Sequence, residues 1–297
     1  MAKIQPAVQT LQYTLPALHA LSYIDISQSV SMLNRRFYRQ GLQWVVAGFS
    51  LHGTNSSETG ILKINKLPNT WMVGNAWEKG FRAWDRMNKE AMAENPSIKP
   101  KFYDFKIWFS FGHLNEAASI LPVDPHGNSY SPYQGEWEIS QYLAPTVGGA
   151  TTVPYDIYML GQDTPGVAVG LLQNYQQSRS VPTSPDPVTN IDGPESIFTA
   201  IFDEGTVQDE DVLDALADEN DELPYHQMEY VGTQGTQCEN VCILPNINTN
   251  QVTRGAGSVF PCGLIEVEGT LTYEATLYVH LVPGPARGYL TQPMTEM

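Results

Sequence analysis

Residues 271–282 read LTYEATLYVHLV, and apolar and polar side chains alternate along this stretch. One face carries Leu271, Tyr273, Ala275, Leu277, Val279 and Leu281, and the other carries Thr272, Glu274, Thr276, Tyr278 and His280. Because successive side chains of a strand point to opposite faces, this period of two predicts a strand with one buried face. Similar short segments recur at 30–39, 42–51, 60–66 and 167–175, bounded by Gly, Pro, Asn or Asp. The pattern predicts a mainly β chain that forms an antiparallel β-sandwich.

Two segments interrupt this pattern and predict helices. Between residues 70 and 94, Trp77, Phe81 and Trp84 recur at spacings of three and four, and Pro96 follows. This spacing predicts one amphipathic helix over about 70–94, with an aromatic stripe that packs in the core. A second, short acidic helix is expected over about 207–217, where Val212, Leu213 and Leu216 form a thin apolar side.

The composition fits a globular chain with a sizeable core, because 42% of the 297 residues are hydrophobic and only 16% are charged. The longest apolar stretch, residues 44–51, is far shorter than the roughly 20 residues that a membrane span requires. We therefore expect no membrane partner. The three cysteines, Cys238, Cys242 and Cys262, are an odd number in a long chain, so we expect buried thiols rather than a disulfide framework or a metal site.

Charge is unevenly distributed along the chain, whose formal net charge is −16. Residues 1–106 hold 13 basic against 7 acidic side chains, and residues 107–297 hold 3 against 25. The run 203–222 carries ten acidic residues and no basic one. A solvated helix face and loop explains this run, while bound calcium remains open, although the regular ligand spacing of a calcium loop is missing.

The basic residues include one cluster that could face phosphate groups. Arg35, Arg36 and Arg39 lie close together in sequence, and Lys63 and Lys66 stand on the next predicted strand but one. Lys and Arg contacts to the backbone dominate nucleic-acid affinity. These five residues are therefore the candidate nucleic-acid-binding residues, although each could also be an ordinary surface charge.

Catalytic motifs are missing from the sequence. No Gly-x-Ser-x-Gly, Gly-x-Gly-x-x-Gly, Gly-x4-Gly-Lys or His-Glu-x-x-His string occurs, and the six histidines are scattered. Glu136 and Glu138 flank Trp137, a composition that glycosidase clefts share, but such pairs are common by chance. We predict a non-enzymatic protein with no catalytic residues, no metal site and no cofactor.

Three long strings carry a resemblance to a known group of proteins. Residues 69–90 read NTWMVGNAWEKGFRAWDRMNKE, residues 260–267 read FPCGLIEV, and residues 280–297 read HLVPGPARGYLTQPMTEM. Together with 171–187 and 202–209, they make the chain from residue 60 onward similar to capsid proteins of uncultured, circular Rep-encoding single-stranded DNA viruses. The resemblance implies one jelly-roll domain over residues 1–297, with terminal extensions that contact neighbouring subunits.

The same resemblance implies a function. Identical subunits would assemble into a small icosahedral shell around a circular single-stranded DNA genome, in a virion formed inside the host cell. Such capsid proteins usually carry an Arg-rich N-terminal arm, whereas residues 1–20 here contain one Lys and no Arg. Genome charge would then be neutralised either by the basic patch on the folded domain or mainly by small cations and polyamines. In both cases we expect weak, salt-sensitive and sequence-independent DNA binding.

Subunit interfaces rest on a few desolvated aromatic anchors. Candidates on or near loops and the C-terminal extension are Tyr130, Tyr133, Trp137, Tyr175 and Tyr289. Each could equally be an anchor within its own subunit. Residues 283–285 (Pro-Gly-Pro) cannot form a strand interior, so the segment is expected to cross to a neighbour or to lie on its own subunit.

Two other classes of protein remain open. A non-viral β-sandwich that binds carbohydrate or acts in adhesion would stack sugars on its aromatic loops. A hydrolase would use Glu136 with a second carboxylate in a deep cleft.

Overall fold

The computed structural model describes residues 6–17, 21–53, 60–93, 97, 104–114, 119–124, 126–128, 130, 137–145, 152–180, 198, 237–246 and 252–297. The chain is mainly β and divides into two compact units. Unit 1 contains Met1–Asn69, Gly112–Glu138 and Cys238–Glu296, and unit 2 contains Thr70–Phe111, Ile139–Gln237 and Met297.

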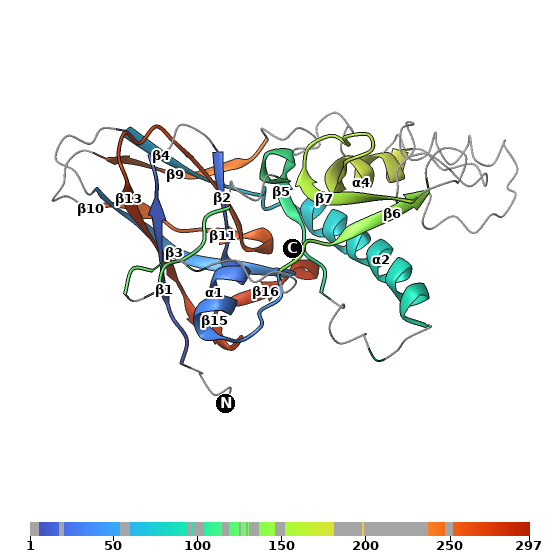
Figure 1. Ribbon diagram of the computed structural model, residues 1–297, viewed down its shortest axis with the longest axis horizontal. Coiled ribbons are helices and arrows are strands. Elements are labelled where there is room, and N and C mark those ends of the chain that lie inside the picture. Colours follow the sequence, from blue (N-terminus) through green and yellow to red (C-terminus); the bar gives the residue numbers. More distant parts are fainter. Residues whose placement is uncertain are drawn as a thin grey trace, which may run out of the picture. The chain divides into compact units, whose positions relative to one another are not determined.

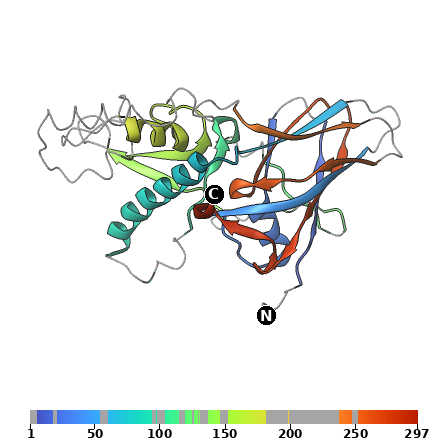
Figure 2. The same cartoon turned by 180° about the vertical axis from the view of Figure 1, so that it is seen from behind.

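Two antiparallel sheets form unit 1. The first has the order β1 (Thr10–Leu15), β13 (Ala275–Leu281), β3 (Leu42–Gly53) and β10 (Val252–Ala256), and β11 (Val259–Phe260) and β16 (Thr291–Pro293) also pair with β3. The second has the order β2 (Leu21–Asp25), β12 (Leu264–Gly269), β4 (Gly60–Lys66) and β9 (Glu239–Asn246). Views from both sides show β4 and β9 in a different layer from β3 and β10 (Figures 1 and 2).

The pairing of the eight main strands follows one rule. In chain order these strands are β1, β2, β3, β4, β9, β10, β12 and β13. The first pairs with the eighth, the second with the seventh, the third with the sixth and the fourth with the fifth, always antiparallel. The two halves of this strand series therefore form one long antiparallel ribbon that is distributed over two sheets.

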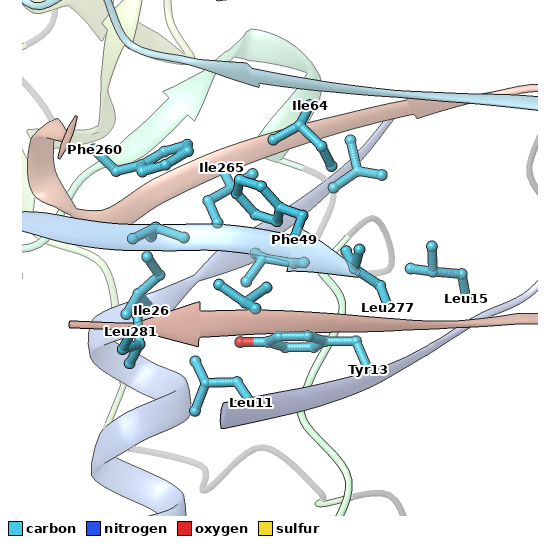
Figure 3. Packing of buried hydrophobic residues seen from close by; sticks show 14 of the residues in the cluster. Leu11, Tyr13, Leu15, Ile26, Phe49, Ile64, Phe260, Ile265, Leu277 and Leu281 are labelled. Carbon is cyan, nitrogen blue, oxygen red and sulfur yellow. The ribbon is translucent and has the colours of Figure 1, made fainter. Parts of the chain in front are cut away.

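The core of unit 1 lies between these sheets. The alternation predicted for residues 271–282 is confirmed in β13, where Ala275, Leu277 and Val279 are fully buried and the residues between them are partly exposed. Figure 3 shows Phe49 and Leu277 of the first sheet and Ile64 and Ile265 of the second around one space. Burial of side chains from both layers is the main stabilising contribution to this unit.

Residues 30–39, predicted as a strand, are instead the end of a helix and a connection. Helix α1 runs over Ile26–Asn34, and the Asp25 carboxylate caps it by accepting the Gln28 N–H at 3.2 Å. Val30 and Met32 alternate with Ser31 as they would in a strand, but Val30 is spaced with Ile26 for one helical face, and both are buried. The prediction was wrong because local capping outweighed the apparent period of two.

The helix predicted over 70–94 is confirmed as α2, Trp71–Ala93, in unit 2. Its aromatic stripe packs in the core, since the rings of Trp77, Phe81 and Trp84 all lie 5.6–5.9 Å from that of Phe105. The Tyr142 hydroxyl donates to the Gly80 carbonyl at 2.8 Å and fixes the neighbouring strand β6 (Gln141–Pro145) against the helix.

The rest of unit 2 is a small mixed sheet and a helix. Strand β7 (Thr152–Leu160) pairs antiparallel with β6 and parallel with β5 (Trp108–Ser110) and β8 (Ala168–Gly170). The strand predicted over 167–175 stops after β8, because Leu171–Ser180 form helix α4 with Leu171 and Tyr175 buried one turn apart. The acidic helix predicted at 207–217 lies outside the described residues.

The C-terminal segment folds back on unit 1. Strand β14 (Pro283–Gly284) pairs with β15 (Gly288–Tyr289), and β16 then pairs with β3. Of the two courses that the sequence left open, the segment takes the one across its own subunit.

Candidate nucleic-acid interface

The three arginines of the basic patch lie at the end of α1 and directly after it. Arg35 adopts a left-handed backbone conformation (φ 53°) that ends the helix, and its N–H donates to the Ser31 carbonyl. Arg36 also donates to Ser31, at 3.2 Å, and both arginines and Arg39 are exposed. The helix end thus directs neighbouring guanidinium groups to the surface.

A groove of about 580 Å³ lies beside this helix end, within unit 1. Its lining residues are Gln28, Ser31, Met32, Arg35, Arg36, Phe37 and Trp137. We call it the α1 groove. It combines two arginines with two aromatic rings, and its volume falls in the range of small-molecule sites.

The aromatic side of the α1 groove joins two distant segments of the chain. The rings of Phe37 and Trp137 lie 5.7 Å apart between centroids at an angle of 50°. Phe37 is 37% exposed, and Trp137 is half-buried. The Trp137 indole N–H donates to Oδ2 of Asp25 at 3.1 Å, so its orientation in the groove is fixed.

Asp25 is buried next to the groove and accepts hydrogen bonds from residues around it. Besides the Gln28 and Trp137 bonds, its Oδ2 accepts from Nε2 of Gln40 at 3.0 Å. Burial is the largest influence on this carboxyl and raises its pKa from 3.8 to about 6, although its hydrogen bonds act in the opposite direction. The charge of the Asp25 carboxyl, next to the groove, therefore changes at about pH 6.

Lys63 and Lys66 are placed elsewhere in unit 1, on β4, and do not line the α1 groove. Lys63 pairs with Glu268 at 3.1 Å. Lys66 is buried, donates to the Ser258 hydroxyl at 2.9 Å and pairs with Glu239 at 3.4 Å. Both ammonium groups thus have carboxylate partners within the chain, and the structure brings neither to the arginines of the groove.

Three residues that form or support the α1 groove were not predicted from the sequence: Asp25, Phe37 and Arg287. Arg287 donates from Nη1 to the Phe37 carbonyl at 2.8 Å, although 250 residues separate the two. For Phe37 a signal existed, because residues 35–39 read RRFYR and interleave basic with aromatic side chains. For Asp25 and Arg287 the contacts depend on the tertiary fold.

The interface candidates have different surroundings. Tyr289 is fully buried in unit 1, where its hydroxyl accepts from Asn34 and donates to Val8, and Tyr175 is buried in unit 2. Both tyrosines therefore pack within their own chain. The sequence had left open whether each candidate packs within its own subunit or at a subunit interface. Tyr130 is half-buried, Trp137 lines the α1 groove, and Tyr133 lies outside the described residues.

The three cysteines are free thiols. Burial raises the pKa of Cys238 to about 12 and that of Cys242 to about 11, and Cys262 is fully buried. Within the described ranges, no group of three metal-ligating side chains occurs. The acidic run 203–222 and Glu136 lie outside these ranges, and Glu138 is exposed. None of the helices in the described part of the chain has the length and apolar character needed to cross a membrane.

Comparisons with models of known protein families, with curated proteins and with solved structures find no match to this chain.

Proposed function

We propose that this chain is a viral capsid protein whose identical subunits assemble into a small icosahedral shell around a circular single-stranded DNA genome. The observation that carries the proposal is the pairing of the eight main strands of unit 1, first with last through to fourth with fifth. A jelly roll is a double sheet of eight strands built from two Greek keys, and this pairing supports that architecture.

In this proposal the capsid domain is the sandwich of unit 1, and the chain between β4 and β9 is a large insertion between its fourth and fifth strands. That insertion contains α2, the β5–β8 sheet and α4. Connections of this length are unusual unless they are functional. We assign contacts between subunits to the insertion.

The α1 groove supports the DNA part of the proposal. Arg35 and Arg36 supply cationic groups, and their position on a folded surface fits a chain whose residues 1–20 contain one basic side chain. A small number of phosphate contacts implies weak, salt-sensitive and sequence-independent binding. In this proposal the protein is located in the virion, which assembles inside a host cell.

The test is the size and shape of the purified protein. A shell subunit forms uniform particles of tens of nanometres in negative-stain microscopy. Several concentrations of salt and of divalent ions should be tested, because the subunit carries a net charge of −16 and like charges repel during assembly. The alternative of a carbohydrate-binding or adhesion module predicts a species near 32.9 kDa or a small oligomer. Absence of particles under every ionic condition would reject the capsid proposal.

A further inference from the structure

We propose that the α1 groove holds one unpaired base of single-stranded nucleic acid, stacked on the Phe37–Trp137 pair, with an adjacent phosphate bound by Arg35 and Arg36. The inference rests on the proposed function and specifies the form of DNA that the patch recognises. It requires that base stacking, and not charge alone, contributes to binding.

The groove has the two components that single-strand binding uses. Proteins that bind single strands without sequence preference combine a cationic path for the backbone with aromatic rings on which bases stack. Here Arg35 and Arg36 line the same groove as Phe37 and Trp137. Every base has a π-face, so this arrangement selects for an unpaired base but not for a sequence.

The Trp137 ring and the backbone at Phe37 are held in place before any ligand enters. Asp25 holds the Trp137 indole through its N–H at 3.1 Å, and Arg287 holds the backbone beside Phe37 through its carbonyl at 2.8 Å. Preorganised side chains lose less conformational freedom on binding. The guanidinium forks of the two arginines suit the paired oxygens of a phosphate.

The same chemistry argues against duplex DNA and neutral sugars as occupants. In a duplex each base is already stacked, so only the phosphates could reach the arginines, and extracting a base costs a few kcal/mol. A neutral sugar could use the rings but brings no negative charge to the two arginines that line the groove. We therefore commit to a single strand.

The experiment uses the full chain and three fluorescent 12-mers: oligo-dT, an abasic strand with the same phosphates, and a duplex. Anisotropy titrations at low salt should show dT binding at least about fivefold more tightly than the abasic strand, since stacking contributes about 1–3 kcal/mol per base. Phe37→Leu keeps an apolar side chain and should reduce this preference. Phe111→Leu, at an exposed phenylalanine of unit 2, is the matched control and should leave the preference unchanged.

Equal affinity for dT and abasic strands, or a preference that survives Phe37→Leu, would overturn the inference. Displacement of dT by a neutral hexasaccharide would also overturn it and favour the carbohydrate-binding alternative. Negative-stain images of the same preparations separate the two proposals. Particles without a base preference refute only the stacking, and a base preference without particles refutes only the capsid function.

Discussion

The Trp137 indole donates a hydrogen bond to the Asp25 carboxylate at 3.1 Å across 112 residues of sequence. Asp25 also caps α1, the helix that ends at Arg35. One buried carboxylate therefore fixes both the aromatic side and the cationic side of the α1 groove. Asp25 is a positioning residue for both.

The raised pKa of Asp25 predicts a pH dependence of stability. The folded pKa of about 6 lies above the reference value of 3.8, so the folded chain binds the additional proton between these values. The stability that this group contributes is complete below about pH 3.8 and is lost as pH rises through 6. From pH 5 to 7.5 the loss should be about 1 kcal/mol.

Asp25→Asn isolates this effect, because all other titrating groups stay the same. Asparagine keeps one acceptor oxygen but carries an amide group, which cannot accept, at the other position. The variant therefore loses either the Gln28 bond or the Trp137 and Gln40 bonds, and we expect it to be less stable at both pH values. Its deficit in the free energy of unfolding should be smaller at pH 7.5 than at pH 5, as measured by urea denaturation. A deficit independent of pH would show that Asp25 does not titrate in this range.

The sandwich core predicts a contrast between neighbouring residues of β13. Leu277 is fully buried among side chains of both sheets, whereas Thr276 is partly exposed. Leu277→Ala should lower the free energy of unfolding by about 2–5 kcal/mol, because it removes apolar burial and leaves a cavity. Thr276→Ala should change it by less than about 1 kcal/mol. Similar losses in both variants would contradict a core on this face of the strand.

A close backbone approach predicts that Gly257 tolerates no side chain. A Cβ placed there would lie 1.9 Å from the Val46 carbonyl oxygen, so β3 and the segment after β10 would have to separate. Gly257→Ala should destabilise unit 1 by about 1–3 kcal/mol or more. Ala256→Ser, at the exposed neighbouring position, is the control. Thermal unfolding would show the difference, and equal midpoints for the two variants would exclude the clash.

The parts of the fold that depend on local periodicity could be predicted from the sequence. The buried alternation of β13 and the aromatic spacing of α2 are direct consequences of a strand face and a helix face. Residues 30–39 show the limit, because Val30, Ser31 and Met32 alternate as in a strand while the Asp25 cap and the left-handed Arg35 determine the two ends of a helix. Local residue type alone does not distinguish these outcomes.

The candidate site could be predicted only in part, for a similar reason. The arginines are clustered in sequence, so Arg35 and Arg36 were identifiable. Lys63 and Lys66 lie on β4, outside the α1 groove, and pair with carboxylates there. Trp137 was expected at a subunit interface, and its place beside Phe37 depends on a loop that returns to unit 1. Long-range pairing of this kind leaves no periodic signal.

The arginine cluster predicts a separation between DNA packaging and shell assembly. Changing Arg35, Arg36 and Arg39 together to alanine removes three exposed cations and leaves the buried core intact. Packaged DNA, measured as nuclease-resistant DNA per particle, should fall while particle yield stays the same. Because each phosphate contact on a single strand contributes about 0.7 to the salt slope, the slope of log affinity against log salt should decrease by about 2.

A control variant removes three positive charges, as the arginine variant does, but at positions outside the α1 groove. Lys63, Arg82 and Lys89 are partly exposed cations that already pair with acidic neighbours, so their joint replacement by alanine changes the net charge equally. If DNA content follows net charge alone, both triple variants should lose the same amount. If the α1 groove binds the genome, only the arginine variant should lose DNA, because Arg35 and Arg36 line the groove with Phe37 and Trp137. Unchanged packaging in the arginine variant would remove this patch from the mechanism and leave small cations to neutralise the genome.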